Sequence, residues 1–142
     1  MTGVDISARQ LEIARSEAPA ATYLHADMAS VAFPPDSFDG VAVFYSLFHV
    51  PREEHAALLG RITAWLRPGG VLVATMGHRD NPCEVEDDWL SAPMYWSQWD
   101  AATNRRLVEA AGLRIICARE ETADEDGAPV TFLWVVAEKP LA

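Results

Sequence analysis

The chain has 142 residues, of which 50% are apolar and 23% are charged, a balance typical of a globular domain with its own core. Its formal net charge of −10 argues against a nucleic-acid backbone or an anionic membrane as a partner. No apolar stretch approaches the roughly 18 residues of a membrane span, and no signal peptide opens the chain. We therefore expect neither a nucleic-acid partner nor a membrane partner.

The cysteine and histidine pattern indicates a reducing compartment and gives no support to a metal site. Cys83 and Cys117 lie far apart, and neither they nor the four histidines show the spacing of metal ligands. We expect a cytoplasmic protein without a disulfide framework. Acidic clusters at residues 84–88 and 120–126 are expected to be solvated loops or strand flanks. An acidic rim that attracts a basic substrate is the second interpretation.

Strand-like and helix-like segments alternate through the first half of the chain. Residues 2–6 are a short predicted strand, and Ser7 is a suitable N-cap for a helix that ends before Pro19. Residues 21–26 and 38–44 are the next predicted strands, and the second of them follows a turn rich in proline.

The second helix begins near Pro51 and carries a buried stripe that includes Leu58 and Ile62. The Pro-Gly-Gly sequence at residues 68–70 ends this helix, and an apolar strand follows at residues 71–76. Residues 77–99 are expected to be irregular and rich in aromatic side chains.

A third helix is capped by Asp100 and ended by Gly112. Two final strands, at residues 113–118 and 130–137, flank an acidic turn. The connection between them is too short for a parallel crossover, so the last strand should run antiparallel. Together the elements predict an α/β fold: a single domain over residues 1–142 with a mostly parallel sheet covered by helices.

Four motifs occur in register along these elements, at residues 3–7, 25–28, 38–41 and 66–72. In order and spacing they resemble the class I S-adenosylmethionine-dependent methyltransferases, over nearly the whole chain. The resemblance implies a Rossmann-like sheet, S-adenosylmethionine as cofactor, a methyltransferase activity and a small-molecule acceptor.

The resemblance also implies which residues face the cofactor. Asp5, with Ile6 beside it, stands where an acidic side chain accepts hydrogen bonds from ribose hydroxyls. Asp27 stands where it can accept from the adenine amino group, with the Met28 backbone against the ring. A helix-capping role for Asp5 and a turn-forming role for Asp27 are the structural alternatives.

The segment after the strand at residues 38–44 lies, in the family, beside the methionine part of the cofactor and the substrate. Tyr45 and Ser46 are therefore candidate cofactor contacts. His49 is a candidate catalytic base, because an imidazole titrates near neutral pH, and packing at a helix start is the alternative. Aromatic and methionine side chains between residues 77 and 99 either line an apolar pocket or pack on the core: Trp89, Met94, Tyr95, Trp96 and Trp99.

Methyl transfer from a sulfonium asks mainly that the acceptor atom, carbon and sulfur be held in line, because the leaving group is already activated. A catalytic triad, a carboxylate pair and a metal cluster are therefore not needed. The sequence leaves the acceptor and its reacting atom open.

The start of the family's cofactor site is missing from this sequence. A nucleotide-binding sheet carries its glycine-rich turn about 20 residues before the ribose acid, whereas four residues precede Asp5. We expect the family's first strand, which is central in its sheet, and its first helix to be absent. A gene model begun too late is the favoured explanation. The others are a natural remnant that forms a homodimer to complete its sheet, and a sheet that closes over the gap.

Two other functions compete with a methyltransferase. One is a non-catalytic, dimeric remnant of the methyltransferase fold. The other is a nicotinamide-dependent oxidoreductase, because Asp5 suits the ribose of that cofactor too. Asp27, Met28 and the antiparallel last strand argue against the oxidoreductase.

Overall fold

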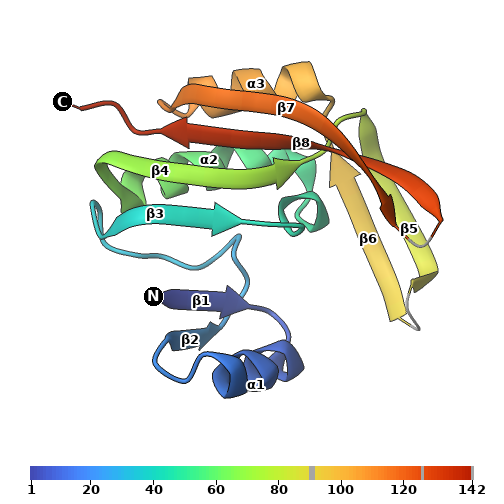
Figure 1. The fold of residues 1–142 in the computed structure, drawn as a ribbon, viewed down its shortest axis with the longest axis horizontal. Coiled ribbons are helices and arrows are strands. Elements are labelled where there is room, and N and C mark those ends of the chain that lie inside the picture. Colours follow the sequence, from blue (N-terminus) through green and yellow to red (C-terminus); the bar gives the residue numbers. More distant parts are fainter. Residues whose placement is uncertain (90–91, 126, 142) are drawn as a thin grey trace. The chain divides into compact units, whose positions relative to one another are not determined.

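The computed structural model describes residues 1–89, 92–125 and 127–141 (Figure 1). Its contacts divide the chain into two compact units, unit 1 (Met1–Phe33) and unit 2 (Pro34–Ala142). That residues 1–142 form a single domain stays a prediction. The elements are, in chain order, β1 (Thr2–Asp5), α1 (Ala8–Glu17), β2 (Thr22–His25), β3 (Phe38–Val43), the 3-10 helix η1 (Leu47–His49), α2 (Arg52–Trp65), β4 (Leu66–Met76), β5 (Asn81–Trp89), β6 (Ala92–Gln98), α3 (Ala101–Ala110), β7 (Arg114–Glu125) and β8 (Ala128–Glu138).

Unit 1 is a β-α-β segment in which β1 and β2 pair in parallel. Ser7 caps α1, as predicted, because its Oγ accepts a hydrogen bond from the backbone N–H of Gln10 at 3.3 Å. The hydroxyl of Tyr23 donates to the carbonyls of Ala14 and Ala18 at 2.9 and 3.0 Å, which fastens β2 to the end of α1. The predicted strands and helix of this segment are confirmed.

Unit 2 is built on a four-stranded sheet in the order β3-β4-β8-β7. β3 pairs with β4 in parallel, and β8 is antiparallel to both of its neighbours. It follows that β3, β4 and β7 point the same way and that β8 alone is reversed (Figure 1). The predicted mostly parallel sheet with an antiparallel last strand is therefore confirmed.

The core of unit 2 lies between this sheet and the helices α2 and α3, which cover one of its faces (Figure 1). Side chains alternate along β4 and β8, so that every second residue faces the helices. The buried apolar side chains from α2, β4 and β8 include Leu58, Leu59, Ile62, Leu72, Ala74, Met76, Leu133, Val135 and Ala137. The buried stripe predicted for the second helix is confirmed.

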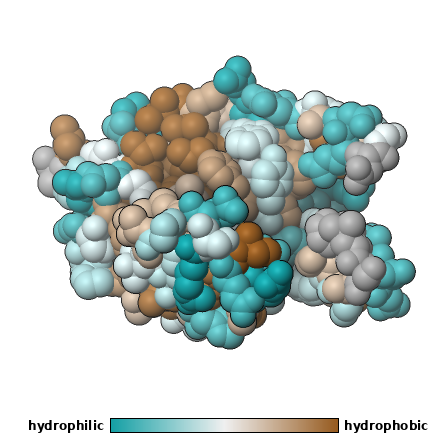
Figure 2. Space-filling view, turned by 60° about the horizontal axis from the view of Figure 1, so that its bottom comes forward, coloured by the Kyte–Doolittle hydropathy of each residue, from teal (hydrophilic) through white to brown (hydrophobic). Residues whose placement is uncertain are grey.

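The surface is otherwise mixed in character. Figure 2 shows apolar residues gathered in one area and hydrophilic residues over much of the rest. Exposed large apolar side chains of unit 2 include Phe44, Tyr45 and Ile116. In the described part of the chain, no helix is long and apolar enough to cross a membrane.

The junction between α2 and β4 differs in detail from the prediction. The helix ends at Trp65, but β4 begins at Leu66 and already contains residues 68–70. Gly69 has φ +79, the positive value expected of its Pro-Gly-Gly sequence. The early start is possible because Leu66 pairs with Phe38, after which the register shifts.

The prediction that residues 77–99 are irregular is wrong. They contain an antiparallel pair, β5 and β6, with Val85 opposite Tyr95 and register shifts on both sides. Pro82 and the acidic residues of β5 disfavour a strand locally, so the pairing with β6 overrides propensity.

The last two strands are also longer than predicted. β7 continues through the acidic stretch to Glu125, and β8 starts at Ala128. Cross-strand pairs such as Thr122 with Thr131, whose hydroxyls lie 2.7 Å apart, stabilise this extension. The acidic residues at 84–88 and at 120–125 are solvent-exposed, as predicted, but on strands, and residue 126 lies outside the described residues.

Each sheet of the described residues ends in edge strands, and β1 and β3 are among them. β1 pairs only with β2, and β3 pairs only with β4, so that β1 and β3 belong to separate sheets.

Candidate functional site

The predicted cofactor residues of unit 1 meet at the carboxyl ends of β1 and β2. Asp5 lies opposite His25 in the parallel register, and the backbone N–H of Ala26 donates to the Asp5 carbonyl at 3.1 Å. Ile6 follows with its side chain 73% exposed, and its carbonyl lies 2.8 Å from Nε2 of the His25 ring. Because carboxyl ends of parallel strands are where open α/β sheets bind ligands, this end is a candidate site.

Asp5 and Asp27 each hold the local backbone with one oxygen. Oδ1 of Asp5 accepts from the backbone N–H of Ser7 at 2.7 Å, and Oδ1 of Asp27 accepts from that of Ala29 at 2.8 Å. The capping and turn-forming roles are thus present. Among the described residues, neither Oδ2 has a hydrogen-bond partner, so each side chain keeps an acceptor for a ligand hydroxyl or amino group.

Asp27 also begins a tight turn that orients the half-buried Met28. The carbonyl of Asp27 accepts from the backbone N–H groups of Ser30 and Val31, both at 3.0 Å. The turn holds the Met28 backbone just beyond the end of β2.

In unit 2, the chain leaves the end of β3 in a strained conformation. Tyr45 has φ +50, a left-handed value that costs a residue with a bulky side chain roughly 1–2 kcal/mol. Its backbone N–H donates to Oγ1 of the buried Thr75 at 2.6 Å, and its ring meets the Phe132 ring edge-on at 5.3 Å. Such strain is characteristic of ligand-binding segments.

Ser46 and His49 follow directly on this segment. Ser46 precedes η1, and its carbonyl accepts from the backbone N–H of His49 at 3.1 Å. The Ser46 side chain makes no capping hydrogen bond. Its neighbours Leu47 and Phe48 are each 2% exposed, so η1 is fixed to the core and Ser46 and His49 have defined positions.

The His49 ring is oriented by the hairpin strand β6. Its Nδ1 lies 2.7 Å from the carbonyl oxygen of Tyr95. Because a carbonyl can only accept, Nδ1 carries the proton, and in the neutral ring the lone pair is on Nε2. No described residue is hydrogen-bonded to Nε2. The ring is therefore held as a proton acceptor.

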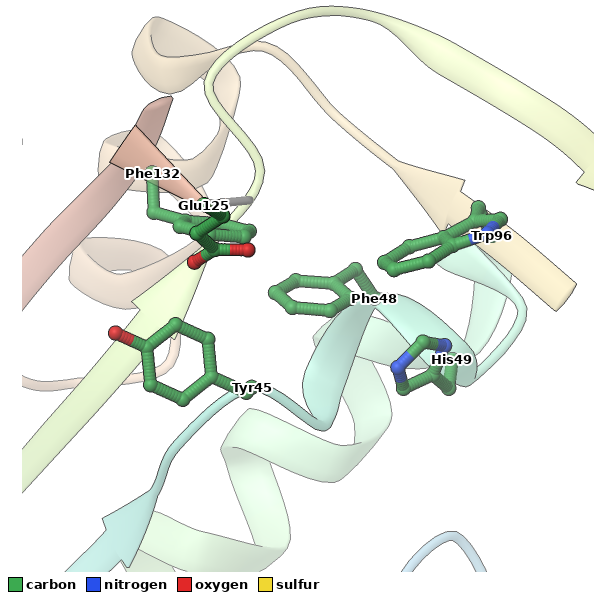
Figure 3. A pocket seen from close by; sticks show the side chains of 6 residues that line it. All are labelled: Tyr45, Phe48, His49, Trp96, Glu125 and Phe132. Carbon is green, nitrogen blue, oxygen red and sulfur yellow. The ribbon is translucent and has the colours of Figure 1, made fainter. Parts of the chain in front are cut away.

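Tyr45 and His49 line an open cavity of about 230 Å³. It lies where β3 and β4 end, because β8 is antiparallel and Leu133, next to Phe132, pairs with Met76, the last residue of β4. Figure 3 shows the side chains around it. The lining residues are Tyr45, Phe48, His49, Trp96, Glu125 and Phe132.

The rings of the cavity form a partly stacked set. Phe48 stacks on Trp96 at a centroid distance of 5.5 Å and on Phe132 at 5.2 Å, with interplanar angles of 24° and 16°. The His49 ring lies 4.6 Å from that of Trp96. Aromatic walls of this kind favour a flat, apolar ligand.

Strand β6, which carries Trp96 at the cavity, is fastened to the start of α2. Oγ of the buried Ser97 accepts from the backbone N–H of Arg52 at 3.0 Å and donates to the carbonyl of Pro82 at 2.8 Å. The Arg52 guanidinium lies 3.9 Å from the Trp99 ring centroid. Trp96 is therefore held at the cavity, whereas Trp99 packs against a structural arginine.

A buried histidine supports the same corner. Nε2 of His55 lies 2.9 Å from the Val50 carbonyl, directly after η1. Burial lowers the pKa of His55 from its ordinary value of 6.5, against the smaller opposing effect of this hydrogen bond. The ring is therefore neutral at pH 7 and acts as a structural donor.

The structure thus gives the predicted residues two groupings. Asp5, Ile6, Asp27 and Met28 gather in unit 1, and Tyr45, Ser46 and His49 gather in unit 2. Of the aromatic residues of 77–99, Trp96 lines the cavity, and the side chain of Trp89 lies outside the described part of the chain. Phe48, Glu125 and Phe132 were not predicted as cavity residues. The place of Phe48 next to His49 was the one local signal, because Glu125 on β7 and Phe132 on β8 reach the cavity through long-range packing.

Comparisons with known proteins agree with this fold. Residues 1–70 match the family model described as a methyltransferase domain. Over 112 residues the chain is 40% identical to a trans-aconitate 2-methyltransferase of Paracidovorax citrulli (strain AAC00-1), covering 76% of this chain and 42% of that protein. The chain thus spans less than half the length of the curated relatives it matches.

Solved structures show the same fold. An S-adenosylmethionine-dependent methyltransferase from Methanosarcina mazei superimposes with a TM-score of 0.82 at 16% identity, over 99% of this chain and 82% of the other. The 1,6-didemethyltoxoflavin-N1-methyltransferase of Burkholderia thailandensis, solved with 1,6-didemethyltoxoflavin and S-adenosylhomocysteine, gives a TM-score of 0.71 at 18% identity, over 98% and 60% of the two chains. Its motifs, its fold and these matches support a class I S-adenosylmethionine-dependent methyltransferase.

Proposed function

We propose that this chain is part of a methyltransferase that moves a methyl group from S-adenosylmethionine to a small molecule by in-line displacement. The observation that carries the proposal is the Asp5 carboxylate at the carboxyl end of β1, with Oδ2 open and Asp27 at the end of the neighbouring strand. The relatives support a small-molecule acceptor, because their names specify trans-aconitate and 1,6-didemethyltoxoflavin.

The hydrogen-bond acceptors of unit 1 fit the adenosine part of this cofactor. Ribose hydroxyls donate hydrogen bonds, and the ionised Asp5 side chain only accepts them. The exposed Ile6 side chain offers an apolar surface for a purine ring, and Asp27 offers an acceptor for an amino group. S-adenosylmethionine supplies an activated methyl group on a positively charged sulfur.

In unit 2, the residues of the cavity orient the acceptor and receive its proton. The aromatic walls fix a flat molecule in one plane. Nε2 of His49 then takes the proton that an N–H or O–H acceptor gives up, while the Tyr95 carbonyl holds the ring through Nδ1. Tyr45 and Ser46, on the strained segment after β3, position the methionine end of S-adenosylmethionine.

A location in the cytoplasm stays a prediction.

Calorimetric titration with S-adenosylhomocysteine tests the proposal. We expect micromolar binding that Asp5→Ala weakens about 10- to 100-fold, the worth of a hydrogen bond to a charged group. Asp87→Ala, which removes an exposed carboxylate of β5, is the matched control and should bind as the unaltered chain does. Equal binding by Asp5→Ala would refute the proposed ribose contact, and no binding by the unaltered chain would refute the proposed function.

The open edges of β1 and β3 favour a second candidate, a non-catalytic protein that dimerises through these strands. Sedimentation equilibrium distinguishes the two. Twice the monomer mass, together with no binding of S-adenosylhomocysteine, supports the non-catalytic dimer. A monomer that binds S-adenosylhomocysteine contradicts it.

A further inference from the structure

The lining of the cavity in unit 2 indicates the size, shape and charge of the acceptor that fits there. Its volume of about 230 Å³ lies just below the roughly 300 Å³ at which pockets for drug-sized ligands begin. Its walls are rings: Tyr45, Phe48, His49, Trp96 and Phe132. Such a cavity suits an acceptor of one or two fused rings.

The arrangement of the rings favours a flat molecule. Phe132, Phe48 and Trp96 form a near-parallel series with centroids 5.2 and 5.5 Å apart. Tyr45 closes one side with its edge, at an interplanar angle of 82° to Phe132. A planar ligand extends this series by stacking, whereas a branched aliphatic ligand does not.

The charges at the cavity are acidic. Glu125 is the one lining residue with a charged side chain, and no arginine or lysine is among the described lining residues. Glu125 forms no ion pair with any described residue. Ring faces carry negative electrostatic potential as well, so both elements attract a cation and repel an anion.

Two arginines of the helices α2 and α3 are engaged in other contacts. Arg52 pairs with Asp80 at 2.7 Å and stacks on Trp99, and Arg105 lies 4.0 Å from Glu120 on β7. A polycarboxylate in the cavity would therefore meet Glu125 and aromatic faces without a compensating positive charge. The relative named for trans-aconitate acts on a tricarboxylate. The described lining does not fit a tricarboxylate as the acceptor of this chain.

We infer that the acceptor is a planar aromatic molecule with zero or positive charge, such as an amine-bearing or nitrogen-containing ring system, and that polycarboxylates are excluded. That the bound molecule is a methyl acceptor rests on the proposed function. The preference of the cavity for flat, non-anionic ligands depends only on the residues that line it.

Binding of size-matched probes to the full chain tests the inference. The probes are N-methylquinolinium as cation, 1-naphthol as neutral molecule, 1-naphthoate as anion, and trans-aconitate. We expect the cation to bind about tenfold more tightly than the anion, with the neutral probe between them and trans-aconitate not bound. Chemical-shift changes at the Trp96 indole and the His49 ring in NMR spectra locate the binding.

Glu125→Gln separates the charge effect from the stacking. This exposed side chain can change without loss of fold, and the variant should weaken cation binding about threefold to fivefold while leaving 1-naphthol unchanged. Glu86→Gln, at an exposed position of β5 outside the cavity lining, is the control and should change nothing.

The inference is overturned if 1-naphthoate or trans-aconitate binds as tightly as the cation, or if no aromatic probe binds at millimolar concentration. Its failure is distinguishable from that of the proposed function, because the probes are titrated without cofactor. If the probes bind in the expected order, with the cation tightest and the anion weakest, and S-adenosylhomocysteine does not bind, the proposed methyl transfer alone is refuted. Cofactor binding with a preference for anions refutes the inference alone.

Discussion

The two units of this chain differ in how much apolar surface they bury. Among the described residues of unit 1, Leu11 is the one buried apolar side chain, whereas unit 2 buries a continuous layer that includes Leu58, Leu72 and Leu133. A two-stranded sheet alone is only marginally stable, whereas four strands covered by two helices can be stable by themselves. The predicted ribose and adenine contacts therefore lie on the less stable part of the chain. Binding of a ligand there should reduce local opening of the backbone more than it would in unit 2.

The largest effect expected from this comparison is on the core of unit 2. Leu133 is 0% exposed on the central strand β8, and Leu133→Ala should lower the free energy of unfolding by about 2–5 kcal/mol because it leaves a cavity. Leu11→Ala should instead speed hydrogen exchange within unit 1 and leave the main urea transition nearly in place. Ile13→Ala, at a 43% exposed position of α1, is the control for Leu11.

Urea unfolding and amide hydrogen exchange check both variants. If Leu11→Ala lowers the main transition as much as Leu133→Ala does, the units do not differ in stability. That outcome would also be the direct sign of one cooperative body over residues 1–142.

A smaller effect is expected from pH, and again in unit 2. Since burial lowers the pKa of His55 in the folded chain, the unfolded chain binds more protons as the pH falls below 6.5, and stability decreases with it. The slope is at most about 1.4 kcal/mol per pH unit for this one group. Above the ordinary value of 6.5, the contribution of His55 is constant.

His55→Gln isolates this contribution, because a glutamine amide can also donate to the Val50 carbonyl but does not titrate. Unfolding free energies from urea at pH 7.5 and 5.5 should differ less for His55→Gln than for the unaltered chain. His25→Gln, at an exposed position of unit 1, should leave the difference unchanged. An equal pH dependence in His55→Gln would show that other groups cause it.

Much of the fold could be predicted from the sequence because its signals are local. The Ser7 and Asp100 caps, the positive φ of Gly69 and Gly112 and the antiparallel final strand depend on neighbouring residues or connection length, and all are found. The β5–β6 pair was missed because acidic residues and Pro82 disfavour a strand locally, and only the partner strand stabilises it.

The candidate site was predictable in part for the same reason. Asp5 ends β1 and Asp27 comes two residues after β2, so their place at one edge can be derived from the alternation of strands and helices. The contact of His49 with the Tyr95 carbonyl, and the presence of Phe132 at the cavity, depend on long-range packing that no local pattern encodes. The extension of β7 brought Glu125 to the cavity from a segment expected to be a turn.

Hydrogen exchange with and without saturating S-adenosylhomocysteine tests the central claim most directly. That claim is that each unit carries its own share of the cofactor contacts. We predict slower exchange at residues 5–7 and 27–31 of unit 1 and at residues 45–49 of unit 2, with little change in β5. No protection at residues 5–7 and 27–31, or no protection at residues 45–49, would contradict the account.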